Sequence, residues 1–187
     1  FKNTRTTTYQ ITPKSLDSAD IQVAAIDNQD YTGSNVVPDV TVTYGTTVLK
    51  KGVDYQCEAE TNTVNPGTAT VVIKGIGNYG GQVTKDFKII GNLESNGRIE
   101  TIAPQAYTGT TVKPAATVTF GGSKLIRGTD YNIDWNNNIE VGTATVTITG
   151  TGVYKGTITG TFNIAYDLAA NGGNKVEPNS IADEYTY

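Results

Sequence analysis

Acidic and amide side chains at alternate positions are the features of this 187-residue chain that come nearest to a catalytic or metal-binding pattern. The pattern occurs in two stretches: Asp54, Gln56, Glu58 and Glu60 in one, and Asp130 and Asp134 in the other. Alternation places such side chains on one outward face of a strand, where calcium binding or carboxylate-pair chemistry could occur. A solvated polar face is the favoured interpretation. Asp54 and Asp130 each precede a tyrosine and have no paired partner at matching places, so they look like turn or cap residues that accept hydrogen bonds from backbone N–H groups.

The numbers of cysteine and histidine residues exclude several kinds of functional site. One Cys, no His and no Met leave no means for a thiolate zinc site, a disulfide or a histidine-based triad. Cys57 aligns with Ile133 and is predicted to be a small buried hydrophobic residue instead of a reactive thiol. We therefore predict a non-enzymatic chain with no catalytic residues, no metal ligands and no cofactor.

Glycine pairs raise the question of a phosphate-binding loop. The pairs Gly75-x-Gly77 and Gly150-x-Gly152 are followed by neither Gly-Lys-Ser/Thr nor a helix start. Tight turns between strands are the favoured interpretation.

Aromatic side chains are the remaining candidates for ligand contact, by stacking on sugar rings. Trp135 has Ala59 as its counterpart, so the fold does not require it, and core or strand-end packing is favoured over a ligand platform. Tyr79 and Tyr154 recur at the same place. We expect these two tyrosines to cover one end of the fold and to hydrogen-bond to backbone, as corner tyrosines do.

An internal repeat positions all of these residues. The segment Gly142-Thr-Ala-Thr-Val-Thr-Ile148 is a near copy of Gly67-Thr-Ala-Thr-Val-Val-Ile73. Earlier landmarks such as Tyr31-Thr-Gly33 and Tyr107-Thr-Gly109 stand 76 residues apart, and those from Gly67 onward stand 75 apart. One residue is therefore lost between Tyr131 and Gly142, as a loop tolerates.

Alternation of apolar and polar residues predicts an all-β fold. In the second copy Val146 and Ile148 would face the core, and Thr145 and Thr147 the other side. The predicted strands cover residues 21–26, 39–44, 53–59, 68–75 and 83–90, then 98–103, 115–120, 129–135, 143–150 and 157–164. Short strands at close spacing without helices indicate antiparallel β-sandwiches.

The repeat also divides the chain. We expect a first repeat over 19–90, a connector at 91–95 and a second repeat over 96–165, in an elongated arrangement. Residues 1–12 match the closing strand of a preceding copy, and 13–18 read as a linker. Residues 166–187 have linker composition and end in a weak match to the start of a further element.

Charge and hydropathy restrict the partners. The net charge is −4 with scattered Lys and Arg, so nucleic acid and anionic membrane are poor partners. No apolar run reaches the roughly 18 residues of a membrane span, so no membrane insertion is expected from this fragment.

The recurring motifs resemble a known family. Tyr-Thr-Gly, Val-x-Pro, Val-Thr-Val-Thr-Tyr-Gly, Leu-x-x-Gly-x-Asp-Tyr, Gly-Thr-Ala-Thr-Val and Gly-x-Gly-x-Tyr-x-Gly are similar to the Ig-like tandem repeats of bacterial cell-surface proteins, which abound in Gram-positive gut anaerobes. The resemblance covers 19–90 and 96–165, with a partial copy at 1–12. It implies two tandem immunoglobulin-like β-sandwiches in an extracellular, cell-wall-attached array.

Two functions follow from the resemblance. One is a stalk or spacer with possible adhesin character, whose partners are neighbouring repeats of the same chain. The alternative is a recognition module for a host glycan, a polysaccharide or a host protein such as an immunoglobulin. Recognition would use features that differ between copies, such as Trp135 or the unequal loops at 60–66 and 136–141.

Overall fold

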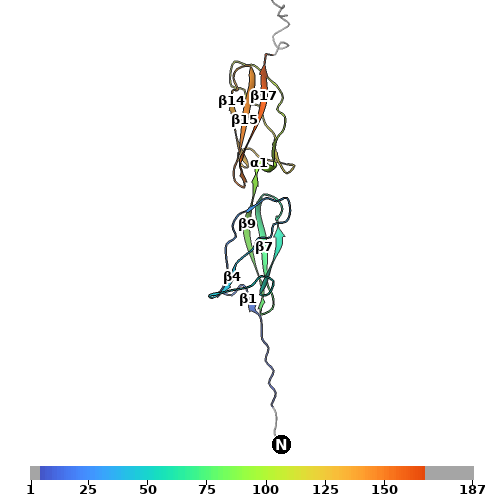
Figure 1. The fold of residues 1–187 in the computed structure, drawn as a ribbon, viewed down its shortest axis with the longest axis vertical. Coiled ribbons are helices and arrows are strands. Elements are labelled where there is room, and N and C mark those ends of the chain that lie inside the picture. The colour runs from blue at the N-terminus through green and yellow to red at the C-terminus, as the bar shows by residue number, and fades with distance from the viewer. Residues whose placement is uncertain (1–4, 167–187) are drawn as a thin grey trace, which may run out of the picture.

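The protein is built almost entirely of β-strands. The structure is a computed structural model that describes residues 5–166 (Figure 1). Strands account for 49% of the described residues and helix for 2%, which confirms the all-β prediction. The predictions for residues 1–4 and 167–187 lie outside this range. Among the described residues, no helix has the length and apolar character needed to cross a bilayer.

Residues 14–90, called the N-terminal half below, contain two main sheets. The strands are β1 (Lys14–Ser15), β2 (Ile21–Val23), β3 (Gln29–Asp30), β4 (Val42–Tyr44), β5 (Thr47–Val48), β6 (Tyr55–Thr61), β7 (Gly67–Gly75), β8 (Tyr79–Gly80) and β9 (Gln82–Asn92). The larger sheet has the order β6-β7-β9 with β3 added on β9, and the smaller one has the order β2-β4-β5.

Residues 91–166, the C-terminal half, repeat this order. The elements are α1 (Leu93–Asn96), β10 (Gly97–Ile99), β11 (Gln105–Ala106), β12 (Val118–Phe120), β13 (Ser123–Lys124), β14 (Tyr131–Asn136), β15 (Gly142–Gly150), β16 (Tyr154–Lys155) and β17 (Thr157–Ala165). The larger sheet has the order β14-β15-β17-β11 and the smaller one β10-β12-β13. The two halves follow one another along the long axis of the molecule (Figure 1).

Strand phase agrees with the alternation in the sequence. Val146 and Ile148 are fully buried, while Thr145 and Thr147 on the other face are half-buried. Each half has its own cluster of buried apolar side chains, drawn from both of its main sheets. The hydrophobic pattern therefore predicted correctly which face of β15 is buried, whereas in β7 Val72 on the opposite face is buried as well.

Pairing is less uniform than the sequence indicated. The long neighbours β6-β7-β9 and β14-β15-β17 are antiparallel. Four two-residue pairs are parallel, however, namely β1 with β8, β3 with β9, β11 with β17 and β16 with β9. The expectation of purely antiparallel sheets is wrong for these pairs, because a two-residue strand carries no periodicity from which pairing can be inferred.

The strands predicted at 39–44 and 115–120 begin only at Val42 and Val118. The carbonyls of Val40 and Ala116 accept hydrogen bonds from the hydroxyls of Tyr55 and Tyr131. The backbone just before each of these two strands is therefore held by a tyrosine hydroxyl and not by strand pairing.

The segment predicted as a linker at 13–18 is part of the fold. Lys14 and Ser15 pair with Tyr79 and Gly80, and Leu16 is 1% exposed within the core of the N-terminal half. A single leucine in a polar segment has no apolar periodicity, which is why the sequence did not reveal its burial.

Residues 5–12 belong to no strand in the structure. Tyr9 and Ile11 are 83% and 81% exposed. The interpretation of this segment as the closing strand of a preceding copy stays a prediction.

Candidate functional site

The joint between the two halves brings together several side chains that differ between the two copies. Strand β9 pairs with β7 of the N-terminal half up to Ile89, and then Gly91 and Asn92 pair with Tyr154 and Lys155 of β16. The connector expected at 91–95 is therefore the end of a strand followed by the single turn of α1. Leu93 in that turn is fully buried in the core of the C-terminal half, so this half begins before the predicted residue 96.

Three aromatic rings pack at the joint. The backbone N–H of Tyr31 donates to the carbonyl of Ile90 over 2.9 Å, which holds the tyrosine at the end of the N-terminal half. The Tyr31 ring meets Phe120 edge-to-face with centroids 4.9 Å apart, and Phe120 meets Tyr154 in the same way at 5.2 Å. Tyr31 packs against both cores, and this is the geometry that aromatic quadrupoles favour.

Close approach at Gly91 makes this packing possible. A Cβ atom at Gly91 would lie 2.9 Å from ring atoms of both Phe120 and Tyr154. Gly91 pairs with Tyr154 as Lys14 pairs with Tyr79, so Lys14 is its counterpart in the N-terminal half. A side chain is thus tolerated at position 14, whereas at position 91 it would clash with the two rings.

An ion pair crosses the joint. Lys155 Nζ donates to a carboxylate oxygen of Asp30 over 2.7 Å, and the two side chains are 53% and 77% exposed. Pairs this exposed contribute about 0–1 kcal/mol. The counterparts of these two residues are Gly80 and Ala106, which carry no charge. The pair can therefore form only between these two halves in this order.

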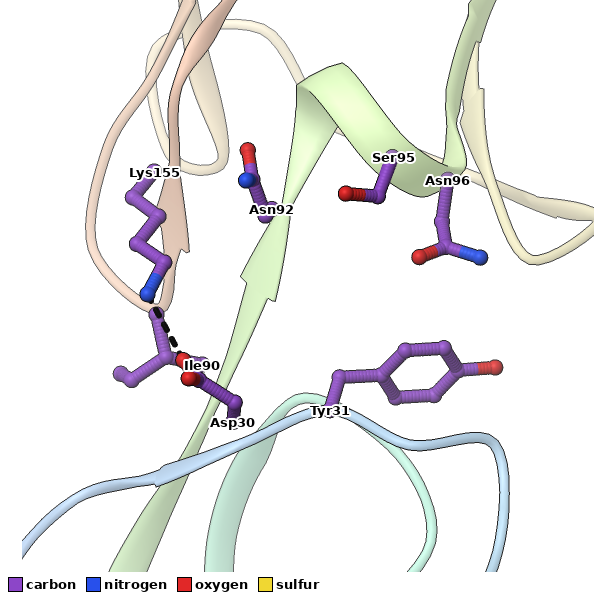
Figure 2. A pocket seen from close by; sticks show the side chains of 7 residues that line it. All are labelled: Asp30, Tyr31, Ile90, Asn92, Ser95, Asn96 and Lys155. Atoms are coloured by element: carbon purple, nitrogen blue, oxygen red, sulfur yellow. Dashed lines mark hydrogen bonds and ion pairs between the residues drawn. The ribbon is translucent and has the colours of Figure 1, made fainter.

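A polar pocket of about 190 Å³, called the joint pocket below, lies beside the ion pair. Figure 2 shows that Asn92, Ser95 and Asn96 line one side and that Asp30, Tyr31 and Ile90 line the other. Lys155 closes one end. Both halves of the molecule thus contribute to its walls.

The tyrosine candidates lie in two separate places. Tyr154 is at the joint, where burial raises the pKa of its hydroxyl, whereas Tyr79 lies at the far end of the N-terminal half. Among the described residues, neither hydroxyl makes the predicted hydrogen bond to backbone. Tyr55 and Tyr131 make such bonds instead, to Val40 and Ala116. The recurrence of tyrosines at matching positions indicated a structural role, but it did not indicate which pair of tyrosines makes the hydrogen bond to backbone.

Trp135 packs against the core of the C-terminal half, as predicted. Lys113 Nζ and Arg127 Cζ lie 5.6 Å and 5.0 Å from the centre of its ring, within the range of cation–π attraction. Its Nε1–H is buried without a hydrogen-bond partner among the described residues. Such a group costs free energy and marks Trp135 as a site worth testing.

Three of the acidic candidates have structural partners. Asp54 accepts from the backbone N–H of Lys50 over 2.8 Å, and Asp130 accepts from that of Ile126 over 2.7 Å, which confirms the predicted turn role. Glu58 forms an ion pair with Lys74, and Asp134 is exposed. Within residues 5–166 no three His, Cys, Asp or Glu side chains are grouped so as to hold a metal ion.

The remaining sequence candidates also have structural roles. Cys57 is half-buried against the N-terminal core, and burial raises the pKa of its thiol, which lowers its reactivity. Gly77 and Gly152 adopt φ values of 65° and 67°, the left-handed region expected of tight turns.

Sequence reasoning missed the joint itself. Asp30, Asn92, Ser95, Asn96 and Lys155 were not candidates, although a signal was present. Asp30 and Lys155 are charged where their counterparts Ala106 and Gly80 are not, and this difference between copies marks the contact.

Comparison with known proteins adds no assignment. No protein-family model matches the chain, and no curated protein sequence matches it.

Proposed function

We propose that this chain is a non-enzymatic, extracellular repeat region of a bacterial surface protein that acts as a stalk or spacer. In this proposal the two halves are tandem immunoglobulin-like β-sandwiches in an elongated arrangement. The resemblance of the repeat motifs supports the family, and the matching sheet order of the two halves supports the tandem arrangement.

The structure of the joint is the main support for this proposal, because a spacer must hold each unit in a fixed position relative to the next. Strand β9 runs without interruption from one half into the other, and Leu93 fastens its end in the second core. Tyr31 and the Lys155–Asp30 ion pair close two further sides of the joint. A joint held at several points restricts bending, which favours projection of a terminal unit over free movement.

Small-angle X-ray scattering of the chain tests this function. We expect the maximum dimension and the shape of the distance distribution to be those of a stiff rod. The comparison variant carries a Gly-Ser-Gly-Ser insertion between Asn92 and Leu93, which should broaden the distribution while both halves stay folded. A wild-type distribution as broad as that of the insertion variant would argue against a spacer.

Recognition of a host glycan, a polysaccharide or a host protein such as an immunoglobulin is the second candidate. One observation favours it: Trp135 has a buried Nε1–H that finds no partner within residues 5–166, two cations lie near its ring, and its counterpart is Ala59. The feature therefore belongs to one half only, as expected of a binding surface added to a repeating fold.

Glycan-array and immunoglobulin-binding assays with Trp135 variants test this second candidate. Trp135→Ala should abolish capture of the ligand and leave the N-terminal half folded. Trp135→Phe keeps an aromatic ring and removes the N–H, so it separates packing from hydrogen bonding. Equal capture by wild type and Trp135→Ala would exclude Trp135 as the contact.

A further inference from the structure

The joint pocket has the dimensions of a small ligand site. At about 30 Å³ per water molecule, its volume of about 190 Å³ holds about six waters. It is smaller than the roughly 300–1,000 Å³ of pockets for drug-sized ligands. A single ring with its substituents is the largest ligand that such a space accepts.

The hydrogen-bonding groups of the joint pocket are mostly uncommitted. The side chains of Ser95 and Asn96 form no hydrogen bond with another residue in the range 5–166. Asn92 accepts from the backbone N–H of Glu94 through Oδ1 at 3.1 Å, and this leaves its NH₂ group free to donate. A serine hydroxyl and an asparagine amide both donate and accept. The wall thus offers mixed donors and acceptors, the complement of neighbouring hydroxyl groups on a ligand.

Charge in the joint pocket is balanced. Lys155 and Asp30 neutralise each other at 2.7 Å, so neither an anion nor a cation would meet an uncompensated opposite charge. The opposite wall includes the Tyr31 ring and the side chain of Ile90, which suit C–H groups. This combination favours a neutral ligand with one polar and one apolar side over a phosphate, a metal ion or a peptide carboxylate.

The counterparts of the pocket residues lack this set of groups. Asn92 and Ser95 lie 77 residues after Ser15 and Ser18, and the Ser18 hydroxyl is already used on the carbonyl of Ser15. Asn96 precedes β10 as Asp20 precedes β2, and the Asp20 carboxylate is already paired with Lys14. Lys155 has Gly80 as its counterpart. The polar pocket is therefore not a by-product of the repeating fold.

We propose that the joint pocket binds a neutral, hydroxyl-rich ring the size of one sugar unit. The ligand contacts Ser95, Asn96 and Asn92 of the C-terminal half, and Tyr31 and Ile90 of the N-terminal half. Because both halves touch it, its binding stiffens the joint. This site is separate from Trp135 and does not depend on the spacer function.

Nuclear magnetic resonance of the ¹⁵N-labelled chain tests the proposal. The probes are glucose, galactose, N-acetylglucosamine and, as a ring without hydroxyl groups, tetrahydropyran. At least one sugar should shift the amide signals of Tyr31 and of residues 92–96 saturably, with a dissociation constant on the order of 1–10 mM. Tetrahydropyran should leave these signals unchanged.

Matched variants locate the site. The double change Ser95→Ala, Asn96→Ala should weaken sugar binding by about tenfold or more. Asn132→Ala, an exposed asparagine of β14, is the control and should bind as wild type does. Both side chains of the double variant are exposed, and unchanged signals from Leu93 and Gly97 will show that α1 is intact.

Three outcomes would overturn the proposal. One is the absence of saturable shifts with every sugar up to about 100 mM. Another is saturable binding that the double variant retains in full. The third is a set of shifts centred on Trp135, which would support the recognition candidate and leave the joint pocket without a ligand.

Discussion

The base of each half, meaning the end that carries β8 or β16, is built from the same elements but closed in a different way. At the base of the C-terminal half, Phe120 is 3% exposed beneath the ring of Tyr31. At the base of the N-terminal half its counterpart Tyr44 is 42% exposed, and the Lys14 ammonium group lies 5.3 Å from its ring. Lys14 also forms an ion pair with Asp20 over 2.7 Å.

The difference between the two bases lies in side chains, not in strand pairing. Strand register is the same at both bases, since Lys14 faces Tyr79 as Gly91 faces Tyr154. What differs is the side chain at that position, because only glycine lets Phe120 and Tyr154 approach the backbone. Side chains at equivalent positions thus determine which contacts each base makes.

Introducing a charged residue into either core tests whether the two halves unfold independently. These substitutions have the largest expected effect on the free energy of unfolding. Val146→Asp and its counterpart Val71→Asp each place an unpaired charge at a fully buried position, which should cost about 3–5 kcal/mol. Thermal unfolding followed by NMR signals from each half is the measurement. Each change should unfold its own half, whereas simultaneous loss of both halves would show a single cooperative unit. Thr147→Asp, on the opposite face of β15, is the control and should cost less than about 1 kcal/mol.

A side chain at Gly91 tests the contrast between the two bases directly. Gly91→Ala introduces a Cβ atom 2.9 Å from two rings and should destabilise the C-terminal half by about 1–3 kcal/mol, as overpacking does. Chemical denaturation of the chain measures this cost. Lys14→Ala at the equivalent place should cost less, since Lys14 has only its exposed contacts to lose. Equal costs at both positions would contradict the comparison.

Removal of the Tyr31 ring should loosen the joint without unfolding either half. The edge-to-face contact with Phe120 contributes about 0.5–1.5 kcal/mol beyond its buried area. Tyr31→Ala should therefore broaden the distance distribution in small-angle scattering. Tyr107→Ala is the matched control, because Tyr107 is the counterpart of Tyr31 but packs on Tyr166 instead. If both variants scatter alike, the Tyr31 ring has no role in the joint.

The ion pair across the joint should have the smallest effect. A double-mutant cycle of Asp30→Asn and Lys155→Ala should give a coupling of at most about 1 kcal/mol, because both side chains are largely exposed. The coupling should fall as salt rises from about 0.01 M to about 1 M, because screening shortens the range of the interaction. A coupling independent of salt would mean that the contact is not electrostatic.

Strand phase, turn residues and core composition could be predicted from the sequence because they depend on neighbours along the chain. Alternation along residues 143–150 indicated the burial of Val146, and the position of Asp130 before Tyr131 indicated a turn. The short parallel pairs and the burial of Leu16 could not be predicted, since neither has a periodic signal.

Local pattern in the sequence by itself determined that this chain forms alternating strands with one buried face, because side-chain direction in a strand follows from the backbone at each residue. The tertiary structure alone decided what meets at the joint. Lys155 and Asp30 are 125 residues apart in the chain, and Tyr31 reaches Phe120 only because β9 places one half against the next. Contacts at such separations depend on the packing of whole sheets, and therefore neither the joint pocket nor the need for glycine at position 91 could be predicted from periodicity.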